Sequence, residues 1–185
     1  MVKLIAVCGL KRSGKDTIAN YIAETYGFKT TKIADPLKKV CKILFDFSDD
    51  QLETDMKEQV DHRWGVSPRK VMQYFGTEIL QHKIEEFLPG MNRQLLLRAC
   101  KFDPLSQDKY VISDMRFIHE YEYLKQIYPG KTSIIIKVVR PEMSTNDQHS
   151  SEQEWNQIPH DCIIHNDGSI ETLYKKVSGA LSFMI

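Results

Sequence analysis

Short apolar runs of strand length alternate along this chain with longer stretches in which apolar residues recur at helical spacing. The runs that we expect to form strands cover residues 4–8, 30–33, 109–113, 134–139 and 161–165. The stretches with helical spacing are 14–26, the segment from Asp35 to Phe45, one that opens at Ser67-Pro68, one that follows residue 113 and ends at Pro129-Gly130, and 169–183. Because this alternation is typical of an α/β fold, we predict a central, mostly parallel five-stranded sheet flanked by helices.

Local signals at the helix ends refine this assignment. Asp35 precedes Pro36, a pair that predicts a helix start with aspartate as the cap and proline in the first turn. Ser151 and Glu154 have the spacing of a capping box. The polar segment 48–65 has no clear period, and we expect a helical excursion with loops there.

The turn between the first apolar run and the first helix carries a phosphate-binding pattern. Gly9 and Gly14 are separated by four residues, and Lys15 follows directly. Glycines let successive backbone N–H groups point into one cavity, and the helix that follows adds its positive dipole end. Lys15 would then neutralise the β and γ phosphates of a nucleotide. The alternative is an ordinary glycine-rich turn between a strand and a helix.

The position after the lysine departs from the general pattern. A phosphate-binding loop normally continues with Ser or Thr, whose hydroxyl binds magnesium, whereas this chain has Asp16 followed by Thr17. A carboxylate close to a triphosphate is repelled unless a cation lies between them. We therefore expect Asp16 to help hold Mg²⁺, directly or through water.

Composition excludes several classes of protein. The 185 residues carry 25 basic and 25 acidic side chains, which argues against broad nucleic-acid binding and against attraction to a membrane surface. We find no apolar stretch of membrane-spanning length and no signal-peptide pattern at the N-terminus. The four cysteines are scattered singly among apolar neighbours, so we expect reduced core residues of a cytoplasmic protein, with metal ligation as the alternative. The length suits one domain.

Each predicted strand ends in polar residues, and in a parallel sheet such ends meet at one edge, where ligands bind. The residues that follow the five strands in order are the glycine loop, Asp35, Asp114 with Arg116, Arg140, and the segment Asn166-Asp167-Gly168. Polar loops after strands are common, so no single one of them is decisive. Their convergence beside a phosphate-binding loop predicts a ligand site at this edge.

Two of these strand-end residues fit roles in phosphoryl transfer. Asp114 is suited to orient magnesium or to accept a proton from an attacking oxygen, and Arg116 is suited to neutralise a transferring phosphoryl group. A structural salt bridge is the alternative for this pair. Arg12, inside the loop, is expected to face phosphate.

Polar residues outside the strand ends fit the binding of a second anion. Arg69 lies in the first turn of a helix, where the dipole disfavours a cation unless an anionic substrate binds nearby; a plain surface charge is the alternative. His149 and Glu152 lie in a polar excursion that is suited to act as a lid and exclude water.

The chain resembles the deoxynucleoside monophosphate kinases of phages and large viruses. The blocks that carry the resemblance are Gly9 to Thr17 with its unusual aspartate, Ala34 to Lys38, Arg69 to Gln73 with Gly76-Thr77-Glu78, Ser113 to Arg116, Val139 to Pro141 with Asn146-Asp147, His149 and Glu152, and Asn166 to Ser169. Together the blocks span nearly the whole sequence.

This resemblance implies transfer of the γ-phosphoryl group of ATP to a deoxynucleoside 5′-monophosphate, in one P-loop kinase domain over 1–185 with a short lid at about 141–159. The implied residues for catalysis are Arg12, Lys15, Asp114 and Arg116. Those for ATP are Gly9, Lys11, Arg12, Ser13, Gly14, Lys15, Asp16, Thr17, Arg140, Asn166 and Gly168, with Asp16, Thr17 and Asp114 for Mg²⁺. Those for the acceptor are Asp35, Lys38, Arg69, Gln73, Asp114, Arg116, Asn146, Asp147, His149 and Glu152.

The sequence is also compatible with other functions. Phosphomevalonate kinase has a similar loop and Asp-x-Arg motif, although the Arg69–Glu78 and Asn146–His149 blocks favour the nucleotide kinase. Dephospho-coenzyme A kinase fits less well because its loop usually carries a hydroxyl after the lysine. A nucleotide-binding regulator is the alternative outside enzymes, and acceptor-side residues such as Asp35, Lys38 and Arg69 favour transfer over it. A homodimer is left open.

Overall fold

The computed structural model of the protein describes residues 1–141 and 154–185. The chain forms two compact units. The first unit contains residues 1–32 and 102–185, and the second contains residues 33–101. Among the helices of the described ranges, none combines the length and the apolar character that a membrane crossing requires.

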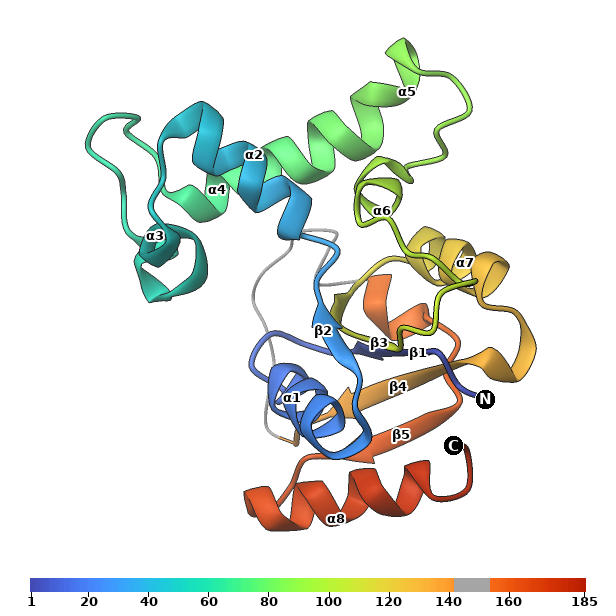
Figure 1. Ribbon diagram of the computed structural model, residues 1–185. Coiled ribbons are helices and arrows are strands. Elements are labelled where there is room, and N and C mark those ends of the chain that lie inside the picture. Colours follow the sequence, from blue (N-terminus) through green and yellow to red (C-terminus); the bar gives the residue numbers. More distant parts are fainter. Residues whose placement is uncertain (142–153) are drawn as a thin grey trace. The chain divides into compact units, whose positions relative to one another are not determined.

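The first unit is built on a five-stranded sheet (Figure 1). Its strands are β1 (Leu4–Cys8), β2 (Lys29–Thr31), β3 (Tyr110–Met115), β4 (Ser133–Val139) and β5 (Cys162–His165). They are arranged in the order β2-β3-β1-β4-β5, and each neighbouring pair is parallel. The predicted five-stranded sheet is confirmed. Because all strands point the same way, their carboxyl ends lie along one edge.

Helices cover both faces of this sheet. The helices of the unit are α1 (Lys15–Tyr26), α7 (Ile118–Ile127) and α8 (Ile170–Leu181), with short 3₁₀ turns η3 (Gly130–Thr132) and η5 (Glu154–Gln157). Helices α1 and α8 lie on one side of the sheet and α7 on the other (Figure 1). The placement of α1 and α7 follows from right-handed crossovers. The chain moves past β3 on its way from β1 to β2 through α1, and it moves past β1 in the opposite direction on its way from β3 to β4 through α7.

The centre of the sheet is fully buried. All five residues of β1 are fully buried. Ile5 and Val7 belong to one apolar cluster with Ile18 and Ile22 of α1 and with residues of α8. The alternate residues of β1 are buried on the opposite face, because side chains of a strand alternate between faces. Polar side chains of the sheet are therefore available for chemistry mainly where the strands end.

The second unit is helical. Its elements are α2 (Asp35–Phe45), α3 (Asp49–Glu53), η1 (Asp55–Glu58), α4 (Pro68–Gln73), the π-helix η2 (Tyr74–Lys83), α5 (Ile84–Phe87) and α6 (Leu95–Ala99). Elements α4, η2 and α5 follow one another without a break, so the helix predicted to open at Ser67-Pro68 continues to Phe87. A Cβ atom at Gly76 would lie 2.6 Å from Leu37 Cδ2, which shows how closely η2 approaches α2.

The caps of this unit test the local predictions. Ser67 caps α4 as expected, because its side chain accepts a hydrogen bond from the N–H of Lys70. The prediction that Asp35 caps α2 is wrong: the N-cap is Ala34, and Asp35 lies in the first turn, where its carboxylate still suits the helix dipole. The excursion over 48–65 begins with an unpredicted capping box between Ser48 and Gln51. Ser151 of the other predicted capping box lies outside the described residues.

Candidate active site

The loop between β1 and α1 needs both of its glycines. Gly9 has a φ of 147° and Gly14 a φ of 101°, values that residues with a side chain rarely adopt. A Cβ atom on Gly9 would lie 2.5 Å from the carbonyl oxygen of Val138, and one on Gly14 would lie 2.5 Å from Asn166 Nδ2. Neighbouring backbone and side chains therefore pack directly against this loop. The strand–loop–helix setting that the glycine pattern requires is present.

Two polar side chains are buried in this loop. Lys15 is 7% exposed, and its Nζ donates a hydrogen bond to the carbonyl oxygen of Leu10 at 2.5 Å. The lysine thus bends back over the loop that precedes it. Ser13 is 1% exposed, and its hydroxyl oxygen is buried without a hydrogen-bond partner among the described residues. A buried hydroxyl of this kind is rare unless a ligand completes its hydrogen bonding.

The ends of two other strands meet the same loop. Asn166, after β5, donates from Nδ2 to the carbonyl oxygen of Ser13 at 2.8 Å. Arg140, after β4, donates from Nη1 to the carbonyl oxygen of Arg12 at 3.4 Å. Arg12 itself has a φ of 64°, an uncommon conformation for a residue with a side chain. The predicted convergence of strand ends on the loop is therefore present for β1, β4 and β5.

Asp16 joins the first turn of α1 to β3. Its Oδ1 accepts a hydrogen bond of 2.7 Å from Ser113 Oγ and lies 3.0 Å from Lys32 Nζ. Burial by itself would raise the pKa of Asp16, but the hydrogen bonds from Ser113 and Lys32 and the charges of Lys32 and Lys15 outweigh burial and lower the pKa. The carboxylate is thus held in its charged form. Neither contact was predicted, because Ser113 is 97 positions from Asp16 along the chain and Lys32 follows a different strand.

Asp114 and Arg116 lie at the carboxyl end of β3, next to the phosphate-binding loop. Met115 between them is paired in register with Cys8, the last residue of β1. Both side chains are partly buried. The chain leaves β1 and β3 toward opposite faces of the sheet, and the gap between two such strand ends is where α/β proteins bind ligands.

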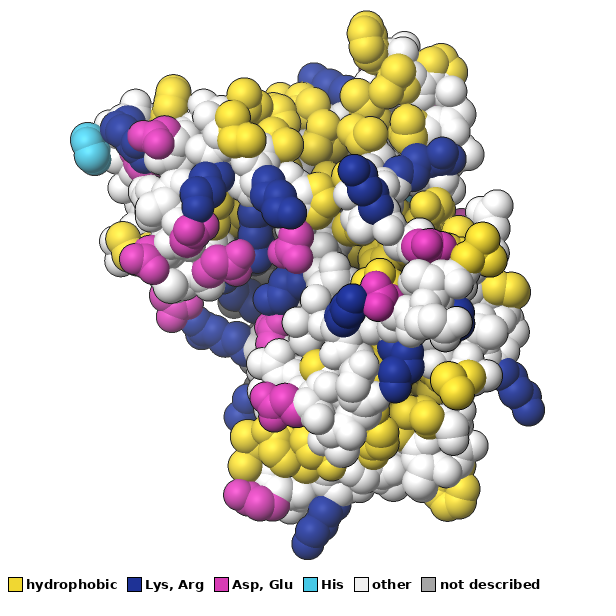
Figure 2. Space-filling model, in the orientation of Figure 1, with side chains coloured by type: hydrophobic (Ala, Val, Ile, Leu, Met, Phe, Trp, Pro, Cys, Tyr) yellow, Lys and Arg dark blue, Asp and Glu magenta, His cyan; other side chains and the backbone are white. Residues whose placement is uncertain are grey.

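The second unit places three of the predicted acceptor residues, Asp35, Lys38 and Arg69, in ion pairs. Lys38 Nζ lies 2.7 Å from Glu53 Oε2 and 4.0 Å from Asp35 Oδ1. Arg69 Nε lies 3.6 Å from Glu58 Oε1. The side chains of both cations are mostly buried, with about 15% exposed for Lys38 and 16% for Arg69. Over α2 and α3, basic and acidic side chains alternate on the face shown in Figure 2.

Gln73 follows Arg69 by one turn of α4, as the spacing predicts, and is partly buried. The residues of the predicted Gly-Thr-Glu block, Gly76 to Glu78, lie in the π-helix η2 rather than in a regular α-helix. In a π-helix the side chains advance by a smaller angle per residue, so the direction of this block does not follow from the 3.6-residue period.

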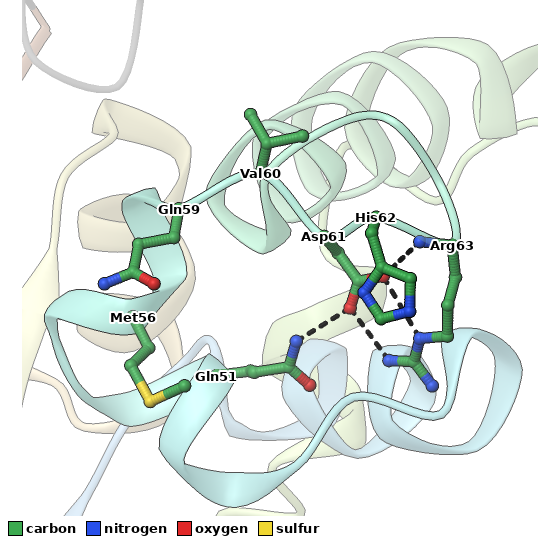
Figure 3. Close-up of a pocket in the computed structure, with 7 residues that line it drawn as sticks. All are labelled: Gln51, Met56, Gln59, Val60, Asp61, His62 and Arg63. Atoms are coloured by element: carbon green, nitrogen blue, oxygen red, sulfur yellow. Dashed lines mark hydrogen bonds and ion pairs between the residues drawn. The ribbon is translucent and has the colours of Figure 1, made fainter.

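The segment that had no predicted role forms a pocket of about 360 Å³ in the second unit (Figure 3). The lining residues are Gln51, Met56, Gln59, Val60, Asp61, His62 and Arg63. Asp61 is buried there and accepts hydrogen bonds from Arg63 Nη2 at 2.8 Å and from Gln51 Nε2 at 2.7 Å. These hydrogen bonds hold the pKa of Asp61 well below its usual range, and the bond from Arg63 makes the largest contribution. The excursion is therefore fixed internally by an ionised carboxylate.

Several residues of the predicted acceptor site lie outside the described ranges. Asn146, Asp147, His149 and Glu152, and with them most of the predicted lid over 141–159, lie outside the described residues. Among residues 1–141 and 154–185, no group of three or more His, Cys, Asp or Glu side chains is arranged to hold a metal ion.

Comparison with known proteins identifies the family. The sequence model of deoxynucleotide monophosphate kinases matches residues 3–61 and 44–177. The chain belongs to the deoxynucleotide monophosphate kinase family. It is 35% identical over 184 residues to a putative deoxynucleotide monophosphate kinase of Acanthamoeba polyphaga mimivirus, covering 94% of this chain and 93% of that relative. It is 24% identical to the deoxynucleotide monophosphate kinase of Enterobacteria phage T4, covering 99% and 100% of the two chains.

Solved structures show the same fold at lower identity. Shikimate kinase from Aquifex aeolicus gives a TM-score of 0.53 at 12% identity, with 97% of this chain and 96% of that chain covered. Dephospho-CoA kinase from Campylobacter jejuni gives a TM-score of 0.50 at 17% identity, with 98% and 96% covered. These likenesses confirm the predicted kinase-type α/β fold.

Membership of this family confirms the resemblance drawn from the sequence motifs. The chain is an enzyme of the deoxynucleotide monophosphate kinase class, and ATP is the phosphate donor that such a kinase implies. The comparisons do not favour phosphomevalonate kinase or a nucleotide-binding regulator.

Proposed function

We propose that the first unit binds ATP through residues 9–17 and that the second unit binds a deoxynucleoside 5′-monophosphate through Lys38 and Arg69. The observation that carries the proposal is the interior of the loop, where Lys15 is buried and the Ser13 hydroxyl has no partner in the described structure. A triphosphate would give both groups an anionic ligand. A coupled assay of ADP release across the deoxynucleoside and ribonucleoside monophosphates tests the activity and defines which bases and sugars are accepted.

The residues around the loop would bind different parts of ATP. Lys15 would leave the Leu10 carbonyl oxygen for the β and γ phosphates, while Arg12 and Arg140 would approach the same phosphates from the loop and from the end of β4. Backbone N–H groups of the loop, including that of Lys11, would face the phosphates. Asn166, with Gly168 beyond it, would border the adenine.

In the reaction, a phosphate oxygen of the acceptor forms a bond to the γ-phosphorus while the bond between that phosphorus and the β–γ bridging oxygen breaks. Negative charge spreads over the transferring group and the leaving ADP. We assign Arg116 to neutralise that charge, since a guanidinium binds phosphate oxygens in a fixed fork. Asp114 would orient Mg²⁺ or the attacking acceptor phosphate next to Arg116.

We further propose that Asp16, Thr17 and Asp114 hold Mg²⁺. Their donors are hard oxygen atoms, and magnesium is usually held by one or two carboxylates together with substrate phosphates and water. The ion would offset charge on the β and γ phosphates when bound. Support comes from Asp16, whose lowered pKa keeps its carboxylate ionised beside the loop.

Asp16→Asn should raise the magnesium concentration that gives half-maximal rate by about tenfold, because it removes one negative charge next to a divalent ion. A magnesium titration of the steady-state rate measures this. The matched variant Lys32→Gln removes the cation that lies 3.0 Å from the same carboxylate. It should lower the magnesium requirement. If both variants shifted the requirement in the same direction, or neither did, Asp16 would serve only to join α1 to β3.

On the acceptor side, the two cations that we assign to the acceptor phosphate form ion pairs with carboxylates of this chain. Glu53 contacts Lys38 through both carboxylate oxygens, at 2.7 and 2.8 Å, and Glu58 lies near Arg69. An acceptor phosphate would compete with these carboxylates for the same donors. We assign Gln73, one turn beyond Arg69, to the base and Asp35 to the sugar or phosphate side.

Glu53→Gln should therefore lower the KM for the acceptor, by up to about fivefold, because an ion pair whose carboxylate is half exposed to solvent contributes about 0.2–1 kcal/mol. Steady-state kinetics with the best acceptor, at saturating ATP, measure the change. Asp49→Asn is the matched control, since it breaks the neighbouring pair with Lys42, which has no role in the proposed site. Equal effects of the two variants would point to a general loss of negative charge instead.

We also infer a cytoplasmic enzyme that acts as one functional domain and binds no nucleic acid. Support for the location comes from the four cysteines, which are all free thiols, two of them buried. A homodimer remains a prediction that sedimentation equilibrium can test.

A further inference from the structure

A buried carboxyl group lies directly behind the Asp114–Arg116 turn. Glu120 is the third residue of α7 and is only 4% exposed. Burial raises the pKa of Glu120 to about 8, and the negative charge of Asp114 adds to this, while hydrogen bonds from the backbone N–H groups of Arg116 and Phe117 and the charge of Arg116 oppose it. Carboxyl groups are seldom buried in this way without a specific partner.

The partners of Glu120 are the backbone N–H groups of the turn itself. Its Oε2 accepts a hydrogen bond of 2.7 Å from the N–H of Arg116 and one of 3.1 Å from the N–H of Phe117. Phe117 is the N-cap of α7 and has no side-chain oxygen to offer to the helix. The carboxyl of Glu120 therefore fixes two consecutive backbone positions at the point where the chain leaves β3.

These bonds fix the backbone position from which the Arg116 side chain extends. Met115 is fully buried and Phe117 is 3% exposed, so the residues on either side of Arg116 are anchored in the core. The N–H of Arg116 is the group that Glu120 holds most closely. With its neighbours packed and its own N–H bound, the backbone of Arg116 has little freedom, and its guanidinium group extends from a fixed base.

We propose that Glu120 is a positioning residue for phosphoryl transfer, which acts by holding the Arg116 backbone so that the guanidinium group meets the transferring phosphoryl group. The proposal rests on the role assigned above to Arg116. A group that is displaced by about 1 Å from its productive position can lose roughly 100-fold in rate, so the loss of two backbone bonds here should be visible in kcat.

The experiment separates positioning from helix capping. Glu120→Ala should lower kcat by about tenfold to 100-fold while the KM for ATP stays within about twofold, and Glu120→Gln, which keeps an acceptor oxygen, should recover most of kcat. Ser133→Ala is the matched control. It removes a buried 2.7 Å hydrogen bond to the carbonyl oxygen of Tyr128 at the other end of α7. It should lower the thermal stability with kcat unchanged.

Two further measurements make the outcome specific. Amide hydrogen exchange of Arg116 and Phe117 should accelerate in Glu120→Ala but not in Ser133→Ala. In an Arg116→Ala background, Glu120→Ala should cost little additional kcat, because the residue then has nothing to position. If Glu120→Ala does not fold, Glu120→Asp, whose carboxylate is one methylene shorter, takes its place in all comparisons.

The proposal would be overturned if kcat stayed within twofold of wild type in the folded variant while stability fell as in Ser133→Ala, since Glu120 would then be only a helix cap. It would also be overturned by additive losses in the double variant. A normal kcat in Arg116→Ala alone would instead contradict the proposed role of Arg116, and so the two failures are distinguishable.

Discussion

Lys15→Ala should lower turnover by about 10²–10³ while the protein stays folded. The loss of one preorganised electrostatic contact to a developing charge typically has an effect of this size. The side chain of Lys15 is 7% exposed and is directed over its own loop. Its ammonium group would follow the charge as it moves from the γ phosphate to the leaving ADP. Single-turnover measurements at saturating ATP and acceptor report the chemical step directly.

Lys175→Ala is the matched control for this change. Lys175 is exposed on α8, in the same unit, and has no place in the proposed site. It should have turnover equal to the wild type within about 20%. Near-normal turnover in a folded Lys15→Ala variant would contradict the assignment of the phosphate-binding loop, whatever the family of the chain.

The features that were predictable from the sequence are those that local patterns encode. The glycine loop could be found because its function requires Gly9 and Gly14 at a fixed spacing between a strand and a helix, and all three parts are contiguous in the sequence. Strands β1 and β4 could be found because they are buried in the centre of a parallel sheet and are therefore continuous apolar runs, whereas the exposed edge strand β2 carries only a weak signal. The meeting of their ends at one edge then follows from parallel pairing alone.

The features that escaped prediction depend on contacts between distant segments or on unusual local geometry. Ser113 and Asp16 are separated by 97 positions, and nothing in either residue type predicts the hydrogen bond between them. Glu120 lies three residues after an N-cap without a side-chain oxygen, so the usual capping-box pattern of Ser or Thr followed by Glu is absent. The π-helix over Tyr74–Lys83 has no recognised sequence period of its own.

Asp35 shows how a local rule can fail by one position. Aspartate before proline is a good cap, but here the helix begins one residue earlier, with Ala34 at the cap position and Asp35 and Pro36 both in the first turn. That shift places Asp35 one turn before Lys38, at 4.0 Å. A charge that was expected to hold a helix end therefore belongs to the group of ionised side chains around the proposed acceptor site.

Arg69→Ala should raise the KM for the acceptor by about tenfold to 100-fold, because hydrogen bonds to a charged group contribute about 1.5–3 kcal/mol. Arg69 lies in the first turn of α4, where the helix dipole disfavours a cation, and its side chain is mostly buried beside Glu58. An acceptor phosphate bound there would offset the unfavourable helix dipole and would give the buried guanidinium group a further anionic partner. Arg69→Lys should recover only part of the affinity, since an ammonium group lacks the planar fork of guanidinium.

The contrast with ATP makes this prediction specific to the acceptor. Calorimetry should give ATP affinities for Arg69→Ala and wild type that agree within about twofold, since no contact with ATP is lost. Arg98→Ala is the matched control, because it removes an exposed arginine from α6 of the same unit, whose guanidinium donates to Gln94 Oε1 at 3.1 Å within the same helix turn. It should leave both affinities unchanged. If Arg69→Ala weakened ATP and acceptor binding equally, Arg69 would act on the structure of the second unit as a whole, and the acceptor phosphate would have to be held by Lys38 and other donors.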